Sequence, residues 1–224
     1  FCGYPSNTPL NHLFPSHISK FFRFSPKTNI NNHLIPLRLQ FNINRPGGTV
    51  VVSEKEIKEC FSEELSWIKD KSLREKVVAI WKTAAEKRGW NSIHDVPFTL
   101  LIDDSGRLTD HTKRMTQMVY AIMKQRKESL NQDYLIAGAL LHDVGKLVEY
   151  DIVNQKIVKG EYGKKFRHPL AGAKLAWDHG LPDEIAHIIY AHSHEGDNTK
   201  RSPEAVIVNH CDFIDFEIKK ALVE

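Results

Sequence analysis

From Ser53 onward the sequence repeats the apolar spacing of an α-helix, and this periodicity constrains the fold more than any other feature. Met115, Met118, Val119 and Ile122 recur at intervals of three and four residues and therefore share one helical face. Similar patterns predict helices at residues 54–69, 73–88, 132–143, 168–178 and 183–193, with others beginning at Asp110 and Ser202. We therefore expect an all-α fold with about five to seven helices.

The boundaries of these helices carry recognisable signals. Residues 53–56 and 72–75 each place a serine three positions before a glutamate, which is a capping box that predicts a helix start. Gly89 is expected to end the second helix and Gly145 the helix at 132–143. Residues 147–162 alternate weakly around a central Asn-Gln pair, which predicts a small β-hairpin.

Residues 1–49 differ sharply in composition from the rest of the chain. They hold five Lys or Arg, six of the ten prolines and no Asp or Glu, and no methionine occurs before Met115. We expect this segment to be a low-order extension outside the fold. It could be a targeting extension, a disordered tail, or upstream sequence read through before initiation near Val50 to Val52. The abrupt change in composition favours the read-through, with residues 50–224 forming the domain.

Charge and apolar content exclude several classes of function. All 28 acidic residues lie beyond residue 53, where 26 basic residues accompany them, so this part carries a net charge of −2. This slightly negative charge argues against a broad, positively charged surface that binds nucleic acid. No apolar run approaches the length of a membrane span. The three scattered cysteines suggest no disulfide framework, so we expect a cytoplasmic protein, and nothing indicates its oligomeric state.

The run Leu140–Lys146, which reads LLHDVGK, places a His and an Asp together at the end of an apolar helix. Neighbouring side chains on a helix diverge by about 100°, which suits two ligands on adjacent edges of one metal ion. Further candidates lie on separate helices that a bundle can bring to one point. The predicted metal ligands are His111, His142, Asp143, His168, His192 and Asp212. Oxygen and nitrogen donors suit one or two divalent ions, namely Mn, Fe, Co, Ni or Zn, with Mg as a further option.

This arrangement, a His followed by His-Asp-Val-Gly-Lys and a distant Asp212, resembles the HD-domain superfamily of metal-dependent phosphohydrolases over residues 107–222. The resemblance implies a helical bundle in which a His, a His-Asp pair and an Asp bind metal. The added His168 and His192 resemble the ligands of dinuclear members, in which the Asp of the pair bridges two metals. This chain lacks the GYP motif of one such group and has His192-Ser193-His194 where some members have adjacent histidines, which leaves open which of the two is the ligand.

The resemblance also implies a reaction. We expect a metal-activated water, which Asp143 would orient, to attack the substrate. The expected substrate is a phosphate monoester or diester of a nucleotide or of another small phosphorylated metabolite. Lys146 would stabilise charge on the phosphoryl oxygens. Lys165, Arg167 and His194 are the further candidates for substrate binding. Three other histidines, His179, His187 and His210, are interpreted as structural.

Two other functions fit the same pattern. The first is a di-iron oxygenase, because such enzymes are built on the same bundle with the same six-ligand pattern. The second is a regulatory or ligand-binding module that has lost activity. The complete ligand set argues against the second, because degenerate modules usually lose at least one ligand.

Overall fold

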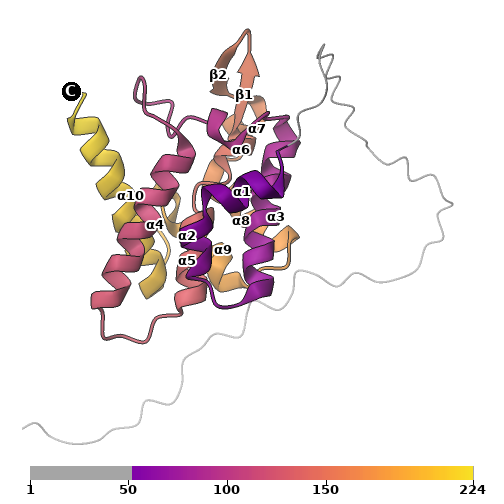
Figure 1. The fold of residues 1–224 in the computed structure, drawn as a ribbon. Coiled ribbons are helices and arrows are strands. Elements are labelled where there is room, and N and C mark those ends of the chain that lie inside the picture. Colours follow the sequence, from indigo (N-terminus) through magenta and orange to yellow (C-terminus); the bar gives the residue numbers. More distant parts are fainter. Residues whose placement is uncertain (1–51, 224) are drawn as a thin grey trace, which may run out of the picture. The chain divides into compact units, whose positions relative to one another are not determined.

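A computed structural model describes residues 52–223, and these form helices with one small hairpin, as the sequence predicts (Figure 1). The elements, in chain order, are α1 (Glu54–Cys60), α2 (Ser62–Ser66), α3 (Lys71–Arg88), η1 (Ile93–Asp95), α4 (Leu108–Gln125), α5 (Gln132–Leu141), α6 (Lys146–Glu149), β1 (Tyr150–Val153), β2 (Lys156–Lys159), α7 (Glu161–Lys165), α8 (His168–Asp178), α9 (Asp183–Ala191), η2 (His194–Gly196) and α10 (Pro203–Ala221). The expectation for residues 1–49 and the exact domain boundary concern residues outside the described range.

Helix α5 forms the centre of the bundle. It is apolar on every side, and residues 135–141 are all buried, which is typical of a core helix. Helices α3, α4, α9 and α10 all pack against it. Because α5 runs through the core, the His-Asp pair that follows it is delivered into the interior of the protein.

The first predicted helix, residues 54–69, is divided into α1 and α2. Phe61 interrupts it with φ −107° and ψ 27°, and its fully buried ring lies 5.0 Å from that of Trp81. The second helix begins earlier than the capping box at Ser72 predicts. Asp70 is the N-cap, and its carboxylate accepts hydrogen bonds from the backbone N–H groups of Ser72 and Leu73. Gly89 ends α3 with φ 65°, as predicted.

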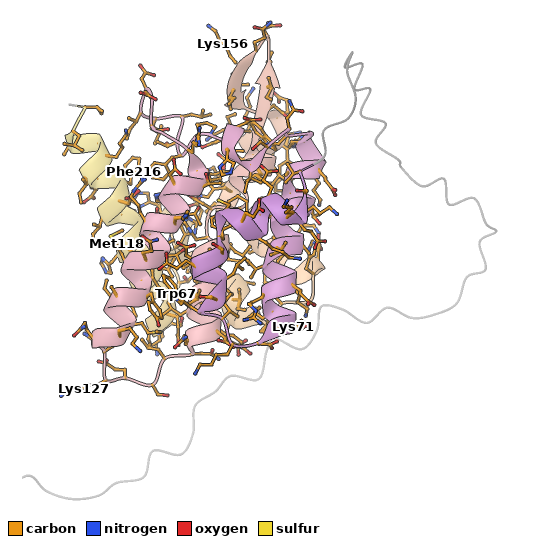
Figure 2. The ribbon with its side chains drawn as sticks, viewed as in Figure 1. Trp67, Lys71, Met118, Lys127, Lys156 and Phe216 are labelled. Carbon is orange, nitrogen blue, oxygen red and sulfur yellow. The ribbon has the colours of Figure 1, made fainter. Side chains whose placement is uncertain are left out.

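The predicted hairpin is present between α6 and α7. Strands β1 and β2 are antiparallel, with Tyr150 opposite Lys159. Asn154 and Gln155 form the two-residue turn with φ 50° and 64°, values that match the twist of the two strands. The hairpin projects from the bundle, with Lys156 near its tip (Figure 2).

Two further observations bear on the expected class of protein. Within residues 52–223, no helix is long and apolar enough to cross a membrane. The two cysteines of this part, Cys60 and Cys211, are both free thiols.

Candidate metal centre

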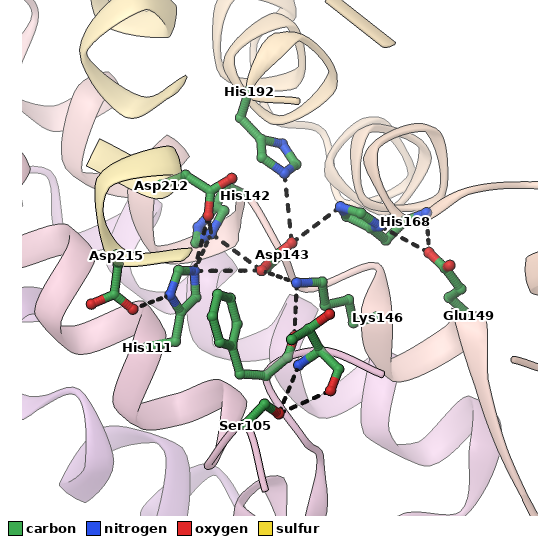
Figure 3. Close-up of polar contacts among 12 residues, drawn as sticks. Ser105, His111, His142, Asp143, Lys146, Glu149, His168, His192, Asp212 and Asp215 are labelled. Atoms are coloured by element: carbon green, nitrogen blue, oxygen red, sulfur yellow. Dashed lines mark hydrogen bonds and ion pairs between the residues drawn. The ribbon is translucent and has the colours of Figure 1, made fainter. Parts of the chain in front are cut away.

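The six predicted ligands come from five parts of the bundle and meet at one buried point (Figure 3). Helix α4 supplies His111 and helix α10 supplies Asp212, while the His-Asp pair follows the last residue of α5. His168 is the first residue of α8, and His192 follows the end of α9. The structure therefore brings together every side chain that the sequence predicts as a ligand.

Four of these side chains form the first donor group. The Nε2 atoms of His111 and His142 are 3.1 Å apart. Oδ1 of Asp212 lies 3.2 Å from His111 Nε2, and Oδ2 of Asp143 lies 3.4 Å from His142 Nε2. Both histidines are fully buried. Two imidazole nitrogens and two carboxylate oxygens thus surround a space about as large as one metal ion.

Asp143 also belongs to the second donor group. Its other oxygen, Oδ1, lies 3.2 Å from Nε2 of His168 and 3.5 Å from Nε2 of His192. The carboxylate therefore turns one oxygen toward each group. This arrangement matches the bridging role that the family resemblance implies for this residue.

The Nδ1 atoms of all four histidines are held by acceptors, which leaves each Nε2 facing the centre. The pairs are His111 with Asp215 Oδ2 at 2.7 Å, His142 with Ala139 O at 2.7 Å, His168 with Glu149 Oε2 at 2.9 Å, and His192 with Ile189 O at 2.6 Å. A carbonyl or carboxylate that accepts from Nδ1–H leaves the Nε2 lone pair free in the neutral ring. Metal-binding histidines are commonly oriented by such partners.

The donor atoms fit a divalent transition metal. Ligands about 2.1 Å from one ion lie about 3.0–3.4 Å from each other in octahedral or tetrahedral coordination, and the closest donor separations here span the same range. Asp143 Oδ1 and His192 Nε2 are buried without a hydrogen-bond partner. Leaving such atoms unsatisfied is costly, whereas a bound cation would satisfy both. The cluster can therefore hold metal ions in both groups.

The ionisation of the site reflects both burial and neighbouring charges. Burial lowers the pKa of His142 and of His168, which keeps these rings neutral and able to bind metal. Burial would raise the pKa of the Asp143 carboxyl, but Lys146 and His142 outweigh it and hold that pKa well below its usual range. For His111, hydrogen bonds to Asp212 and Asp215 outweigh burial and raise the pKa, so a proton and a metal ion compete for this ring.

Lys146 lies beside the donor groups, as the sequence predicts. Its ammonium donates to Asp143 Oδ2 at 2.6 Å and to the backbone carbonyl of Phe98 at 2.9 Å. Burial alone would lower the pKa of Lys146, but the charge of Asp143 outweighs it and raises the pKa. The ammonium is therefore fixed and charged at the edge of the cluster.

The prediction that Gly145 ends the helix at 132–143 is wrong, because α5 ends at Leu141. The φ of Gly145 is −61°, and this residue precedes α6. A Cβ at this position would lie 2.0 Å from the carbonyl oxygen of His168 and 2.8 Å from the backbone nitrogen of Gly172. Glycine is needed here because the start of α8, which carries His168, packs directly against this backbone.

A cavity of about 220 Å³ opens over Asp143 and Lys146. Arg167 and His194, two of the predicted substrate-binding residues, also line it. Lys165 is exposed at the end of α7 and is not part of the lining. His194 pairs with Asp197 at 3.1 Å and His192 faces Asp143, so the geometry favours His192 as the ligand.

Sequence reasoning missed the residues that orient the ligands. Asp215 accepts from His111 and from Arg114, while Glu149 accepts from both the ring and the backbone N–H of His168. The spacing of Asp215, three residues after Asp212 on one helix, is a signal that could have identified it. Glu149 offers no such signal, because it reaches the site only through the packing of α6 against α8.

The histidines interpreted as structural lie outside the cluster. His179 contacts Thr83 and the carbonyl of Leu175, His187 accepts from the N–H of Ser202, and His210 is exposed. None of the three is part of either donor group.

Comparison with known proteins gives one family and two kinds of relative. Residues 108–216 match the HD domain. The chain is 27% identical over 172 residues to dihydroneopterin 2′,3′-cyclic phosphate phosphodiesterase of Methanocaldococcus jannaschii, covering 70% of this chain and 68% of that protein. It is 34% identical over 83 residues to ribonuclease Y of Thermotoga maritima, covering 37% of this chain and 14% of that protein. No solved structure gives a significant match.

Proposed function

The chain belongs to the HD domain family through residues 108–216, and we propose that it is a metal-dependent phosphohydrolase acting on a phosphate monoester or diester of a small molecule. The observation that carries this proposal is the Asp143 carboxylate, which turns one oxygen toward each of two buried donor groups. The two kinds of relative support it, because one is named a phosphodiesterase and the other a ribonuclease.

Two divalent transition metals are the proposed cofactors. The first would be held by His111, His142, Asp143 and Asp212, and the second by Asp143, His168 and His192. When bound, such ions lower the pKa of water toward neutrality and polarise a phosphoryl oxygen. The nitrogen and oxygen donors favour Mn, Fe, Co, Ni or Zn, and leave room for water and substrate.

Lys146 and Asp143 are the proposed catalytic residues. A lysine ammonium has three N–H donors, and Lys146 uses two of them, on Phe98 and Asp143. The third donor is available to a phosphoryl oxygen in the cavity that Lys146 lines, where it would stabilise negative charge as the phosphorus–oxygen bond breaks. Asp143 would orient the attacking water, because its carboxylate lies between the donor groups.

Arg167 and His194 are the proposed substrate contacts at the rim of the cavity. The Nε of Arg167 lies 3.4 Å from Glu195, and this guanidinium lines the cavity beside His168. From this place the guanidinium of Arg167 could donate hydrogen bonds to a bound phosphate ester and orient it. Lys165 is left out of this proposal, because it does not line the cavity.

The test uses the full chain, freed of metal and reloaded separately with Mn, Co, Ni, Zn or Mg. We expect hydrolysis of at least one member of a panel of phosphate monoesters and cyclic diesters, and loss of activity in His142→Ala and Asp143→Ala. His210→Ala is the matched control, because that histidine is exposed and outside both donor groups. It should retain full activity.

Two results would count against the proposal. Full activity of Asp143→Ala with both ions still bound would remove this residue from the reaction. An oxygen-dependent spectral change of the iron-loaded protein, without hydrolysis by any metal form, would favour the di-iron oxygenase instead.

A further inference from the structure

One wall of the cavity over Asp143 is formed by aromatic and aliphatic side chains. Phe98, Phe213 and Phe216 line it together with Leu100 and Leu101. Leu100 and Leu101 are exposed and Phe213 and Phe216 are half-buried, so these parts of the wall are open to a ligand, whereas Phe98 is buried behind them. Nothing in the proposed hydrolysis requires an apolar surface at this place.

The aromatic part of the wall is tied to the donor groups. The ring of Phe98 stacks on the ring of His111, with centroids 3.7 Å apart, and Phe216 meets Phe98 edge to face at 6.2 Å. Phe213 follows Asp212 directly on α10, and Phe216 lies about one turn further along the same helix. The wall is therefore held at a fixed distance from the place where phosphate would bind.

The charges of the cavity are balanced. Its lining contains three cations, Lys146, Lys159 and Arg167, and three carboxylates, Asp143, Glu149 and Asp212. Each cation already faces a carboxylate, at 2.6 Å for Lys146 and Asp143, 3.2 Å for Lys159 and Glu149, and 3.4 Å for Arg167 and Glu195. Apart from the proposed metal ions, each of these cations has a carboxylate partner, so the cavity offers little net positive charge to a second phosphate.

We propose that the substrate carries a single phosphate group joined to a flat ring, which packs against Phe213 and Phe216. This inference rests on the proposed function, which places the phosphate between the donor groups and Lys146. Flat rings gain both burial and favourable ring contacts at such a wall. The volume of about 220 Å³ falls below the roughly 300–1,000 Å³ of sites for drug-sized ligands, which suits one small ring system inside the cavity.

The test measures binding, so that it does not depend on turnover. Phenylphosphonate, cyclohexylphosphonate and methylphosphonate share one head group and differ only in the attached group. Binding of each to the zinc-loaded full chain is measured by calorimetry. We expect phenylphosphonate to bind about fivefold to tenfold more tightly than methylphosphonate, with cyclohexylphosphonate between them. A second phosphonate on the ring should not tighten binding.

The variants Phe213→Ala and Phe216→Ala should each reduce the preference for the phenyl group to about twofold or less, while binding of methylphosphonate is retained. Phe216→Leu keeps an apolar side chain without a flat face and should fall between. Trp177→Ala is the matched control, because Trp177 is half-exposed on α8 and lies outside the cavity.

Equal affinity for phenylphosphonate and methylphosphonate, or a preference that survives both alanine variants, would overturn the inference. These outcomes are distinct from failure of the proposed function. A ring preference without hydrolysis of any phosphate ester would reject only the hydrolase, whereas hydrolysis without a ring preference would reject only the aromatic wall.

Discussion

The contact between Gly145 and α8 predicts that Gly145→Ala will selectively weaken the second donor group. The added Cβ would lie 2.0 Å from the carbonyl oxygen of His168, whereas an ordinary contact begins at 3.4 Å. The opposing atoms belong to the backbone, so the start of α8 must retreat by about 1.4 Å to restore normal packing. His168 would then move away from Asp143, from which its Nε2 is now 3.2 Å distant.

Two quantities follow from this displacement. Overpacking of this kind costs about 1–3 kcal/mol, and alanine recovers at most about 1 kcal/mol through its less flexible unfolded state. The net loss is then at most about 3 kcal/mol, and a loss of about 1–2 kcal/mol, near the middle of that range, lowers Tm by about 2–8 °C in a domain of this size. Misplacing His168 should weaken binding of the second ion by about 10–100-fold, the range found when the geometry of a ligand is disturbed.

Equilibrium dialysis with elemental analysis counts the ions bound at each free-metal concentration, and thermal unfolding of the metal-free protein gives the change in stability. Gly160→Ala is the matched control. Its Cβ would lie 2.1 Å from Asp151 Oδ2, which is the terminal oxygen of a side chain rather than a backbone atom. If Gly145→Ala binds both ions like the wild type and unfolds at the same temperature, the close approach of α8 to Gly145 does not position His168.

Two further substitutions test the residues that orient the histidines. Asp215→Asn leaves His111 with a neutral partner, so the affinity of the first donor group for metal should fall by about 10–100-fold while the second group is unchanged, as followed by the same dialysis. Hydrogen bonds with His168, against the opposing effect of burial, lower the pKa of Glu149 to about 2. A lowered carboxyl pKa adds stability that is fully present above the unfolded value of about 4.3 and is lost as the pH falls toward 2. Denaturant unfolding of the metal-free protein should therefore show Glu149→Gln as less stable than the wild type at pH 6, with the difference shrinking between pH 4.5 and 2, and a constant difference would contradict this reasoning.

The positions of the candidate ligands could be predicted from the sequence because they interrupt apolar helices with side chains that bind metal. His142 and Asp143 follow a helix that is apolar on every side. Polar side chains are seldom buried at such a place unless they have a partner, which favours a bound ion. The structure brings these side chains together with the other four. Their role as ligands stays a prediction until metal binding is measured.

The partners of the ligands could not be predicted in the same way. Asp215 has a spacing signal only once Asp212 is taken as a ligand, and Glu149 has none, because only the packing of α6 against α8 shows that it faces a histidine. The start of α3 illustrates the same limit. Asp70 rather than Ser72 caps this helix, and the backbone N–H groups of Lys69 and Asp70 donate to the carboxylate of Asp133, more than 60 residues away in the chain.

The shared carboxylate of Asp143 restricts how this protein can change during evolution. A replacement at position 143 removes a donor from both groups at once, so it would weaken both proposed ion sites rather than leave one of them intact. Loss of His168 or His192 instead removes a donor from one group only. If both groups bind ions, we expect relatives that bind a single ion to have lost His168 or His192, so sequence differences should appear at these two positions before they appear at Asp143.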